Sequence, residues 1–220
     1  MVINQGKLIV IDGIDGSGKT TQVNLLAEYL KEKKIPYEVI SFPRYEDNLY
    51  GKLIRRYLEG EFGDINDVNP YLVALAYAGD RVLAKPLIEK WLAEGKLVIA
   101  NRYVSASKAH LGANLPEEKR AEFINWLDEL EYGTHKMPKA DLTILLKVDP
   151  KIGQKNVAGK HTDIHEQNLK HLEEAHKIYL ELAKSEDNWY VVDCANDGGM
   201  KTREKIQSEI RQILQNRLNE

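Results

Sequence analysis

The sequence GIDGSGKT at residues 13–20 fits the phosphate-binding loop pattern G-x-x-x-x-G-K-[ST]. Glycines in such a loop allow backbone N–H groups to turn inward around phosphate oxygens. Lys19 can then reach the β and γ oxygens of a bound nucleotide, and the Thr20 hydroxyl can bind Mg²⁺. The loop therefore predicts a site for a nucleoside polyphosphate.

The residues on either side of the loop strengthen this interpretation. Residues 7–12 (KLIVID) form a short apolar run rich in β-branched side chains, which is typical of a buried strand. After the loop, Val23, Leu26, Ala27 and Leu30 recur at helical spacing and mark one face of a helix. A strand, a glycine loop and a helix in this order favour a nucleotide site over a glycine-rich turn with a solvated lysine.

Four further apolar runs predict strands, at residues 37–41, 97–100, 141–148 and 189–192. Helical patterns separate the runs, which favours an α/β fold, with a parallel five-stranded sheet of the P-loop NTPase type and helices on both faces. Asn69 and Pro70 are suited to start a helix that runs to Ala93 and stops at Gly95. Further helices are expected at residues 116–131 and 201–218, and we expect residues 1–220 to form a single domain.

Composition excludes several classes of protein. The formal net charge is −3, so no global basic field points to a nucleic-acid partner. The single cysteine, Cys194, ends an apolar run and is expected to be a buried thiol in a reducing compartment. No secretory leader pattern and no membrane-length apolar run is evident, so we expect a cytoplasmic protein with no membrane partner.

Residues 151–165 are polar, contain two glycines and lie between a predicted strand and a predicted helix. Phosphotransferases have a mobile lid at this place, and we expect one at about residues 150–166. A plain surface loop is the alternative that composition leaves open.

Arginines distinguish this chain from other P-loop proteins. Two features typical of GTPases are missing: the guanine-reading tetrapeptide N-K-x-D, and a D-x-x-G that follows a strand. Arg44 and Arg102 each follow a predicted strand, so both are expected at the carboxyl edge of the sheet, beside the phosphate loop. Guanidinium groups donate paired hydrogen bonds that suit a phosphate monoester. Tyr77 and Arg81 share one helix face, which could bind a base or could be ordinary core and its rim.

With these residues assembled, the chain resembles the thymidylate kinases, a family of P-loop nucleoside monophosphate kinases. The resemblance rests on GIDGSGKTTQ at 13–22, FPRY at 42–45, YAGDR at 77–81 and NRYVSASKAHLG at 101–112, and it extends over nearly the whole chain. It implies phosphoryl transfer from Mg·ATP to the 5′-phosphate of dTMP, giving dTDP. It also implies a homodimer whose partners are small nucleotides.

The resemblance assigns roles by position. The ATP-binding residues would be Gly13, Gly16, Ser17, Gly18, Lys19, Thr20 and Thr21, with Thr20 also the metal ligand. The monophosphate-binding residues would be Phe42, Arg44, Tyr77, Arg81, Arg102, Ser107 and His110. In detail, Arg44 and Arg102 would grip the phosphate, Tyr77 would stack on the base and Arg81 would bond its edge, while Phe42 lines the pocket. The catalytic set would be Lys19, Arg102, Asn101 and Asp15, which approaches the 3′-hydroxyl of the acceptor.

Three departures from the family pattern bear on activity. Asn101 stands where the family has an aspartate, and Leu111 stands where it has a residue able to hydrogen-bond a base. Members of the family that have no arginine inside the phosphate loop generally carry arginines in the lid. Here position 16 in the loop is glycine, and the proposed lid offers lysines (Lys151, Lys155 and Lys160) in place of arginines. These departures leave two alternatives to a dTMP kinase: a kinase with altered base preference, or a nucleotide-binding pseudokinase with little turnover.

Overall fold

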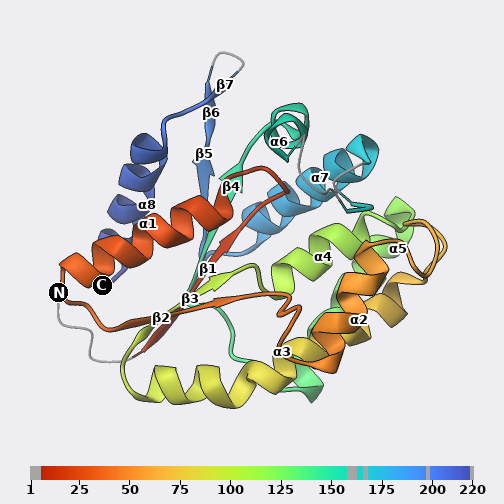
Figure 1. The fold of residues 1–220 in the computed structure, drawn as a ribbon, viewed down its shortest axis with the longest axis horizontal. Helices are drawn as coiled ribbons and strands as arrows, with labels where there is room; N and C mark the ends of the chain where they lie inside the picture. Colours follow the sequence, from red (N-terminus) through yellow and green to blue (C-terminus); the bar gives the residue numbers. More distant parts are fainter. Residues whose placement is uncertain (1–5, 158–162, 166–167, 197–198, 219–220) are drawn as a thin grey trace.

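The apolar runs of the sequence form the centre of the molecule. A computed structural model describes residues 6–157, 163–165, 168–196 and 199–218. Its main sheet has five parallel strands: β1 (Lys7–Asp12), β2 (Tyr37–Ser41), β3 (Leu97–Asn101), β4 (Leu142–Lys147) and β5 (Trp189–Asp193). Their order is β2-β3-β1-β4-β5, and Figure 1 shows the sheet running diagonally between two layers of helices. The predicted α/β fold and its strands are confirmed within one or two residues.

Burial on both faces explains why the strands read as continuous apolar runs. β1 is flanked by β3 and β4, and Ile9 lies opposite Ile99 on one side and Leu142 on the other. Successive side chains of β1 point to opposite faces of the sheet, so Val10 joins one core cluster and Ile11 another. A polar side chain on either face would therefore lie in a core, which restricts polar residues to the strand ends.

Helices cover both faces of the sheet. One face carries α1 (Lys19–Glu32) and α8 (Arg203–Leu218), which lie side by side in Figure 1. The other face carries α3 (Pro70–Ala93), α4 (Val104–Gly112) and α7 (Leu169–Ser185), with α2 (Leu49–Leu58) and α5 (Glu117–Asp128) packed outside them. Asn69 caps α3 as expected, its side chain accepting a hydrogen bond from the Tyr71 N–H at 2.9 Å. Among the described helices, none is long and apolar enough to cross a membrane.

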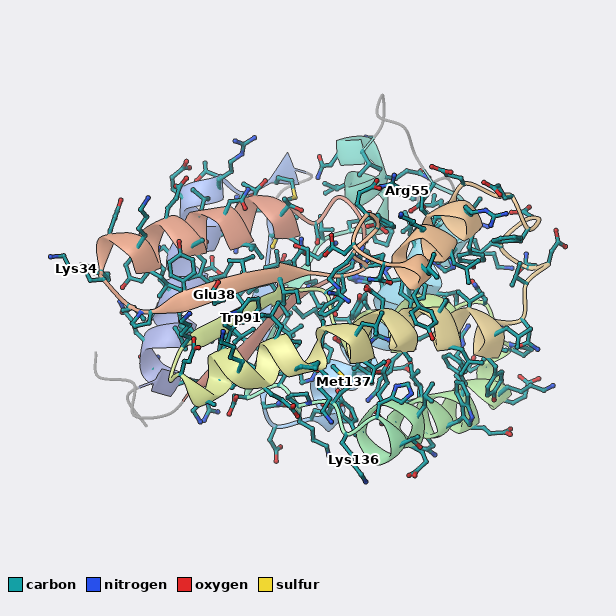
Figure 2. The ribbon with its side chains drawn as sticks, turned by 60° about the horizontal axis from the view of Figure 1, so that its bottom comes forward. Lys34, Glu38, Arg55, Trp91, Lys136 and Met137 are labelled. Carbon is teal, nitrogen blue, oxygen red and sulfur yellow. The ribbon has the colours of Figure 1, made fainter. Side chains whose placement is uncertain are left out.

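The predicted helix at residues 116–131 is α-helical at first and then becomes π-helical. α5 ends at Asp128 and continues as π-helical turns over Glu129–Thr134, where the Glu131 side chain is fully buried. The chain then leaves through Lys136, whose φ of 54° lies in the left-handed region. Figure 2 shows Lys136 projecting from the edge of the molecule, whereas Met137, the next residue, lies beneath α3 and is buried.

Two short features complete the chain. The segment expected as a lid begins with a helix, α6 (Pro150–Val157), so its first half is ordered structure and not an irregular loop. The antiparallel pair β6 (Ala195–Asn196) and β7 (Gly199–Met200) connects the sheet to α8. Between β5 and β6, Cys194 is buried as predicted, and burial raises the pKa of its thiol to about 12.

Candidate active site

The phosphate loop joins β1 to α1 with a backbone that only glycine adopts readily. Gly13, Gly16 and Gly18 have φ angles of 142°, 75° and 92°, all in the region that side chains disfavour. The Lys19 ammonium folds back over the loop and donates to the Gly13 and Ile14 carbonyl oxygens at 3.0 and 2.8 Å. No side chain caps the start of α1, so its first N–H groups are open to an anion.

A cavity of about 620 Å³ lies over this loop. One wall is the loop itself and the start of α1, from Asp15 to Gln22, and the opposite wall is the segment from Met200 to Arg203. The predicted ATP-binding residues Gly16, Ser17, Gly18, Lys19, Thr20 and Thr21 all line it. Gly13 is not among the lining residues, but its carbonyl oxygen accepts a hydrogen bond from Lys19. Arg203 was not predicted, because nothing in the sequence marks it except its place at the start of the last helix.

Oxygen atoms at one side of this cavity suit a magnesium ion. The Asn101 amide nitrogen donates to the Thr20 hydroxyl at 3.4 Å, and the Asn101 Oδ1 is buried without a hydrogen-bond partner among the described residues. The buried Ser17 hydroxyl likewise has no partner in the described part of the chain. Hard cations bind such oxygen donors, so the Thr20 and Asn101 oxygens could hold Mg²⁺ here.

Asp15 and Arg102 form an ion pair that links the phosphate loop to the end of β3. Burial alone would raise the pKa of Asp15, but the Arg102 guanidinium and the Lys19 ammonium hold it well below its usual range. Arg102 has a φ of 65°, a conformation that costs on the order of 1–3 kcal/mol for a side-chain-bearing residue. Its other contacts, to the Gly13 carbonyl at 3.3 Å and His110 Nε2 at 2.9 Å, hold it there.

A second, smaller cavity of about 70 Å³ lies on the other side of this ion pair. Of the predicted monophosphate-binding residues, Tyr77, Arg102, Ser107 and His110 line it. Asp15 and Arg102 line both cavities. The remaining wall includes Tyr45, Leu111, Asp163 and His165.

Arg81 lies behind this wall and not in it. It is fully buried, and its Nε donates to the Glu131 carboxylate at 2.8 Å. A terminal nitrogen of Arg81 donates to the Ser107 hydroxyl at 2.9 Å, so Arg81 reaches the cavity through Ser107. Although burial alone would lower the pKa of Arg81, the Glu131 carboxylate raises it above its usual value. The expected bond from Arg81 to a base edge stays a prediction.

Arg44 and Phe42 also lie outside the lining of the smaller cavity. Arg44 donates from Nε to the Asp80 carboxylate at 2.9 Å and from a terminal nitrogen to the Asp80 carbonyl at 2.7 Å. Phe42 lines the larger cavity, and the Arg44 guanidinium lies 5.9 Å from the centre of its ring. The structure therefore places both residues beside the site, and their contact with an acceptor stays a prediction.

The helix α6 packs directly on the phosphate loop. A Cβ at Gly16 would lie 1.9 Å from the Gly153 carbonyl oxygen, and a Cβ at Gly153 would lie 2.6 Å from the Asp15 carbonyl oxygen. The Asn156 amide donates to the Gly16 carbonyl at 2.9 Å. The predicted lid lysine Lys155 is exposed on α6 and does not line either cavity. Lys160 lies outside the described residues.

Comparisons with known proteins agree on one family. The thymidylate kinase family model matches residues 11–210. A probable thymidylate kinase of Pyrococcus horikoshii is 33% identical, over 97% of this chain and 98% of that protein. A probable thymidylate kinase of Pyrobaculum aerophilum is 31% identical, over 94% of this chain and 95% of that protein.

A solved structure extends the agreement to the fold. The thymidylate kinase of Candida albicans superposes with a TM-score of 0.79, covering 98% of this chain and 94% of that one. At 24% sequence identity this likeness establishes the architecture alone.

We predict that Gly153→Ala lowers affinity for a nucleoside triphosphate about tenfold. The added methyl would meet the Asp15 carbonyl oxygen and push α6 off the phosphate loop; overpacking of this kind costs roughly 1–3 kcal/mol. The measurement is calorimetric titration with a non-hydrolysable ATP analogue. Gly199→Ala is the matched control, because no atom of the described residues lies within 4 Å of a Cβ there. Equal affinities in the two variants would contradict the prediction.

Proposed function

This chain belongs to the thymidylate kinase family, and we propose that it transfers the γ-phosphoryl group of ATP, as its magnesium complex, to the 5′-phosphate of dTMP. An oxygen of the acceptor phosphate attacks the γ-phosphorus, the bond from that phosphorus to the β–γ bridging oxygen breaks, and ADP leaves. The product, dTDP, serves nucleotide biosynthesis. The observation that carries this proposal is that Asp15 and Arg102 line both cavities.

A shared wall is what a transfer between two bound nucleotides requires. With ATP phosphates on the loop and the acceptor phosphate beside Arg102, the two reacting groups approach each other across the Asp15–Arg102 pair. Catalysis of phosphoryl transfer is mostly positioning and charge neutralisation, since the protein performs little covalent chemistry. Lys19 and Arg102 supply fixed positive charge on the two sides of the transferred group.

The magnesium ion fits the oxygen atoms already described. Thr20 and Asn101 would hold it, through a hydroxyl and an amide oxygen that lacks another partner among the described residues. When bound, the ion neutralises charge on the β- and γ-phosphate oxygens. The task of this chain's own residues is to present the loop N–H groups and Lys19 to the same phosphates.

The acceptor side is assigned to the smaller cavity. Tyr77 presents a ring for base stacking, and Arg102 presents its guanidinium to the phosphate. Because Arg81 donates to the Ser107 oxygen, the Ser107 hydroxyl proton is left to donate to an acceptor atom in the cavity. A nucleotide needs a pocket of roughly 300 Å³ or more, so this cavity of about 70 Å³ has to widen when the acceptor binds.

We expect ADP formation from Mg·ATP to depend on dTMP when the purified chain is offered dTMP, dUMP, UMP and CMP in parallel. Coupled detection of ADP gives the rate for each acceptor, and Lys19→Ala is the control for background hydrolysis. A clear preference for dUMP, UMP or CMP would favour the altered base specificity that Leu111 suggests. Absence of acceptor-dependent ADP with all four would refute the kinase assignment.

Asn101→Asp distinguishes a fully active kinase from a weakly active relative. A carboxylate at this position adds a charge beside Thr20 and a stronger magnesium ligand, so we expect the variant to need less Mg²⁺ for half-maximal rate. A gain in kcat of about tenfold or more would show that Asn101 limits the turnover of the wild type, as the pseudokinase alternative requires. Asn114→Asp, which lies outside both cavities, is the control.

An exposed apolar face on α2 and α3 supports a homodimer. It consists of Leu49, Tyr50, Leu53, Leu72, Leu75, Leu83 and Leu87, which are 41–82% exposed. On α3 the leucines recur at near-helical spacing, so they share one face of the helix. A second copy of this chain is the occupant we propose, in keeping with the expected cytoplasmic, nucleotide-binding protein without a nucleic-acid partner.

We expect sedimentation velocity to give a particle of twice 25.1 kDa, and Leu75→Glu with Leu83→Glu to reduce it to a monomer. Two carboxylates on each copy would have to be buried without partners, which is strongly unfavourable. Val191→Glu is the control, because Val191 is 45% exposed on β5, outside this face. A monomeric wild type, or a double variant that stays dimeric, would contradict the assignment.

A further inference from the structure

Three histidines from separate parts of the chain meet at the edge of the smaller cavity. His110 lies on α4, His171 on α7, and His165 in the described segment that precedes α7. All three are buried, and one ring nitrogen of each lies within 4.8 Å of the others. None of the three was recognised from the sequence as part of a cluster, since His110 is 61 residues from His171.

Hydrogen-bond polarity fixes the protons on two of these rings. The Arg102 guanidinium only donates, so His110 Nε2, at 2.9 Å, accepts and His110 carries its proton on Nδ1. His110 Nδ1 then donates to His171 Nε2 at 3.3 Å. His171 therefore carries its proton on Nδ1, which is buried and has no hydrogen-bond partner among the described residues. The Nε2 lone pair of His171 points into the cluster.

Metal binding needs neutral rings, and burial lowers the pKa of all three: well below the usual value for His110 and His165, and to about 4 for His171. The lone pair of His171 already faces the cluster. That of His110 is on Nε2, so the His110 proton has to move from Nδ1 to Nε2 before His110 can bind an ion. His165 is oriented by the Tyr57 hydroxyl, 3.1 Å from its Nε2, which leaves its Nδ1 as the atom available to a ligand.

We propose that His110, His165 and His171 form a binding site for one borderline divalent transition-metal ion of the Zn²⁺ class. An all-imidazole donor set favours such ions over Mg²⁺, which prefers oxygen. Nitrogen atoms bound tetrahedrally at ~2.0–2.1 Å stand about 3.4 Å apart, close to the 3.3 Å between His110 Nδ1 and His171 Nε2. The third ring, that of His165, has a nitrogen within 4.8 Å of the nitrogens of the other two. It has to move inward by little more than ~1 Å to reach the tetrahedral spacing.

The local charge permits an additional cation. Arg102 contacts His110 and would repel the ion, but Arg102 is itself paired with Asp15 and lies 3.9 Å from Asp12. The Tyr179 hydroxyl, on α7, also donates a hydrogen bond to the Asp12 carboxylate at 2.6 Å. The two carboxylates offset the single guanidinium, so the ion enters a region without net positive charge from these groups.

Occupancy of this site would act on the kinase through His110. A metal on His110 Nδ1 forces the ring proton to Nε2, and His110 then no longer accepts the bond from Arg102. Arg102 loses one of the contacts that hold it beside the acceptor cavity. The ion also ties the segment before α7 to α4 across that cavity. We therefore expect the metal to weaken acceptor binding, an effect that rests on the proposed function.

The binding test uses tag-free, chelator-treated protein without nucleotide or Mg²⁺. Titration with Zn²⁺ by calorimetry should give one ion per chain, and Co²⁺ should give the visible absorption of a tetrahedral nitrogen site. His171→Gln, which keeps an acceptor for His110, should lower the affinity at least tenfold. His176→Gln is the matched control, because His176 lies on the same helix outside the cluster. No stoichiometric binding by the wild type, or equal affinity in the two variants, would overturn the proposal.

A folding check and a kinetic experiment complete the test. His165→Gln, with circular dichroism and a melting curve for each variant, should reproduce the loss of affinity in a folded protein. With Mg·ATP in excess, Zn²⁺ should raise the KM for the acceptor in the wild type and in His176→Gln, and less in His171→Gln. Equal inhibition of all three would overturn the coupling to Arg102. Because the binding measurement contains no substrate, its result stands whether or not the chain proves to be a dTMP kinase.

Discussion

The ion pair between Asp15 and Arg102 is the interaction on which the site depends. Asp15 belongs to the phosphate loop and Arg102 follows β3, so the pair joins two segments that parallel pairing of β1 and β3 brings to the same edge. Arg102 adopts a left-handed backbone conformation, and its contacts to Asp15, Gly13 and His110 offset the free-energy cost of that conformation. Without that pair, the two cavities would lose their common wall and the arginine its orientation.

Two arginines in this molecule, the half-buried Arg44 and the buried Arg81, support the walls of the site. Arg44 and Arg81 come from motifs expected to contact the acceptor. In the structure, however, Arg44 pairs with the buried carboxylate of Asp80, and Arg81 pairs with that of Glu131. A buried ion pair is costly to break, because the remaining charge has no partner. These two arginines therefore fix the position of β2's end and of Ser107, so this part of the acceptor wall is held in place before the acceptor binds.

Sequence patterns predicted the fold and the place of the phosphate loop between a strand and a helix, because both rest on local information. The strands are continuous apolar runs, and the loop from Gly13 to Thr20 carries its chemistry within eight positions. The acceptor side depends on pairs far apart in the chain. Glu131, 50 residues from Arg81, lies in π-helical turns with no sequence signature, and His165 and His171 stand at a spacing that matches no metal motif. Arg203 lines the larger cavity because α8 packs on α1.

The close contact between Gly16 and Gly153 has a consequence for how this protein could change over time. The Gly153 backbone occupies the space that a side chain at Gly16 would need, and the Asp15 carbonyl oxygen, one residue before Gly16, occupies the space that a side chain at Gly153 would need. A single substitution at position 16, to arginine for example, would have to displace α6 and break its Asn156 hydrogen bond. The two positions are thus coupled, because a side chain at either one requires α6 and the loop to separate. An arginine in the loop therefore needs a rebuilt α6, whereas an arginine in place of the exposed Lys155 does not.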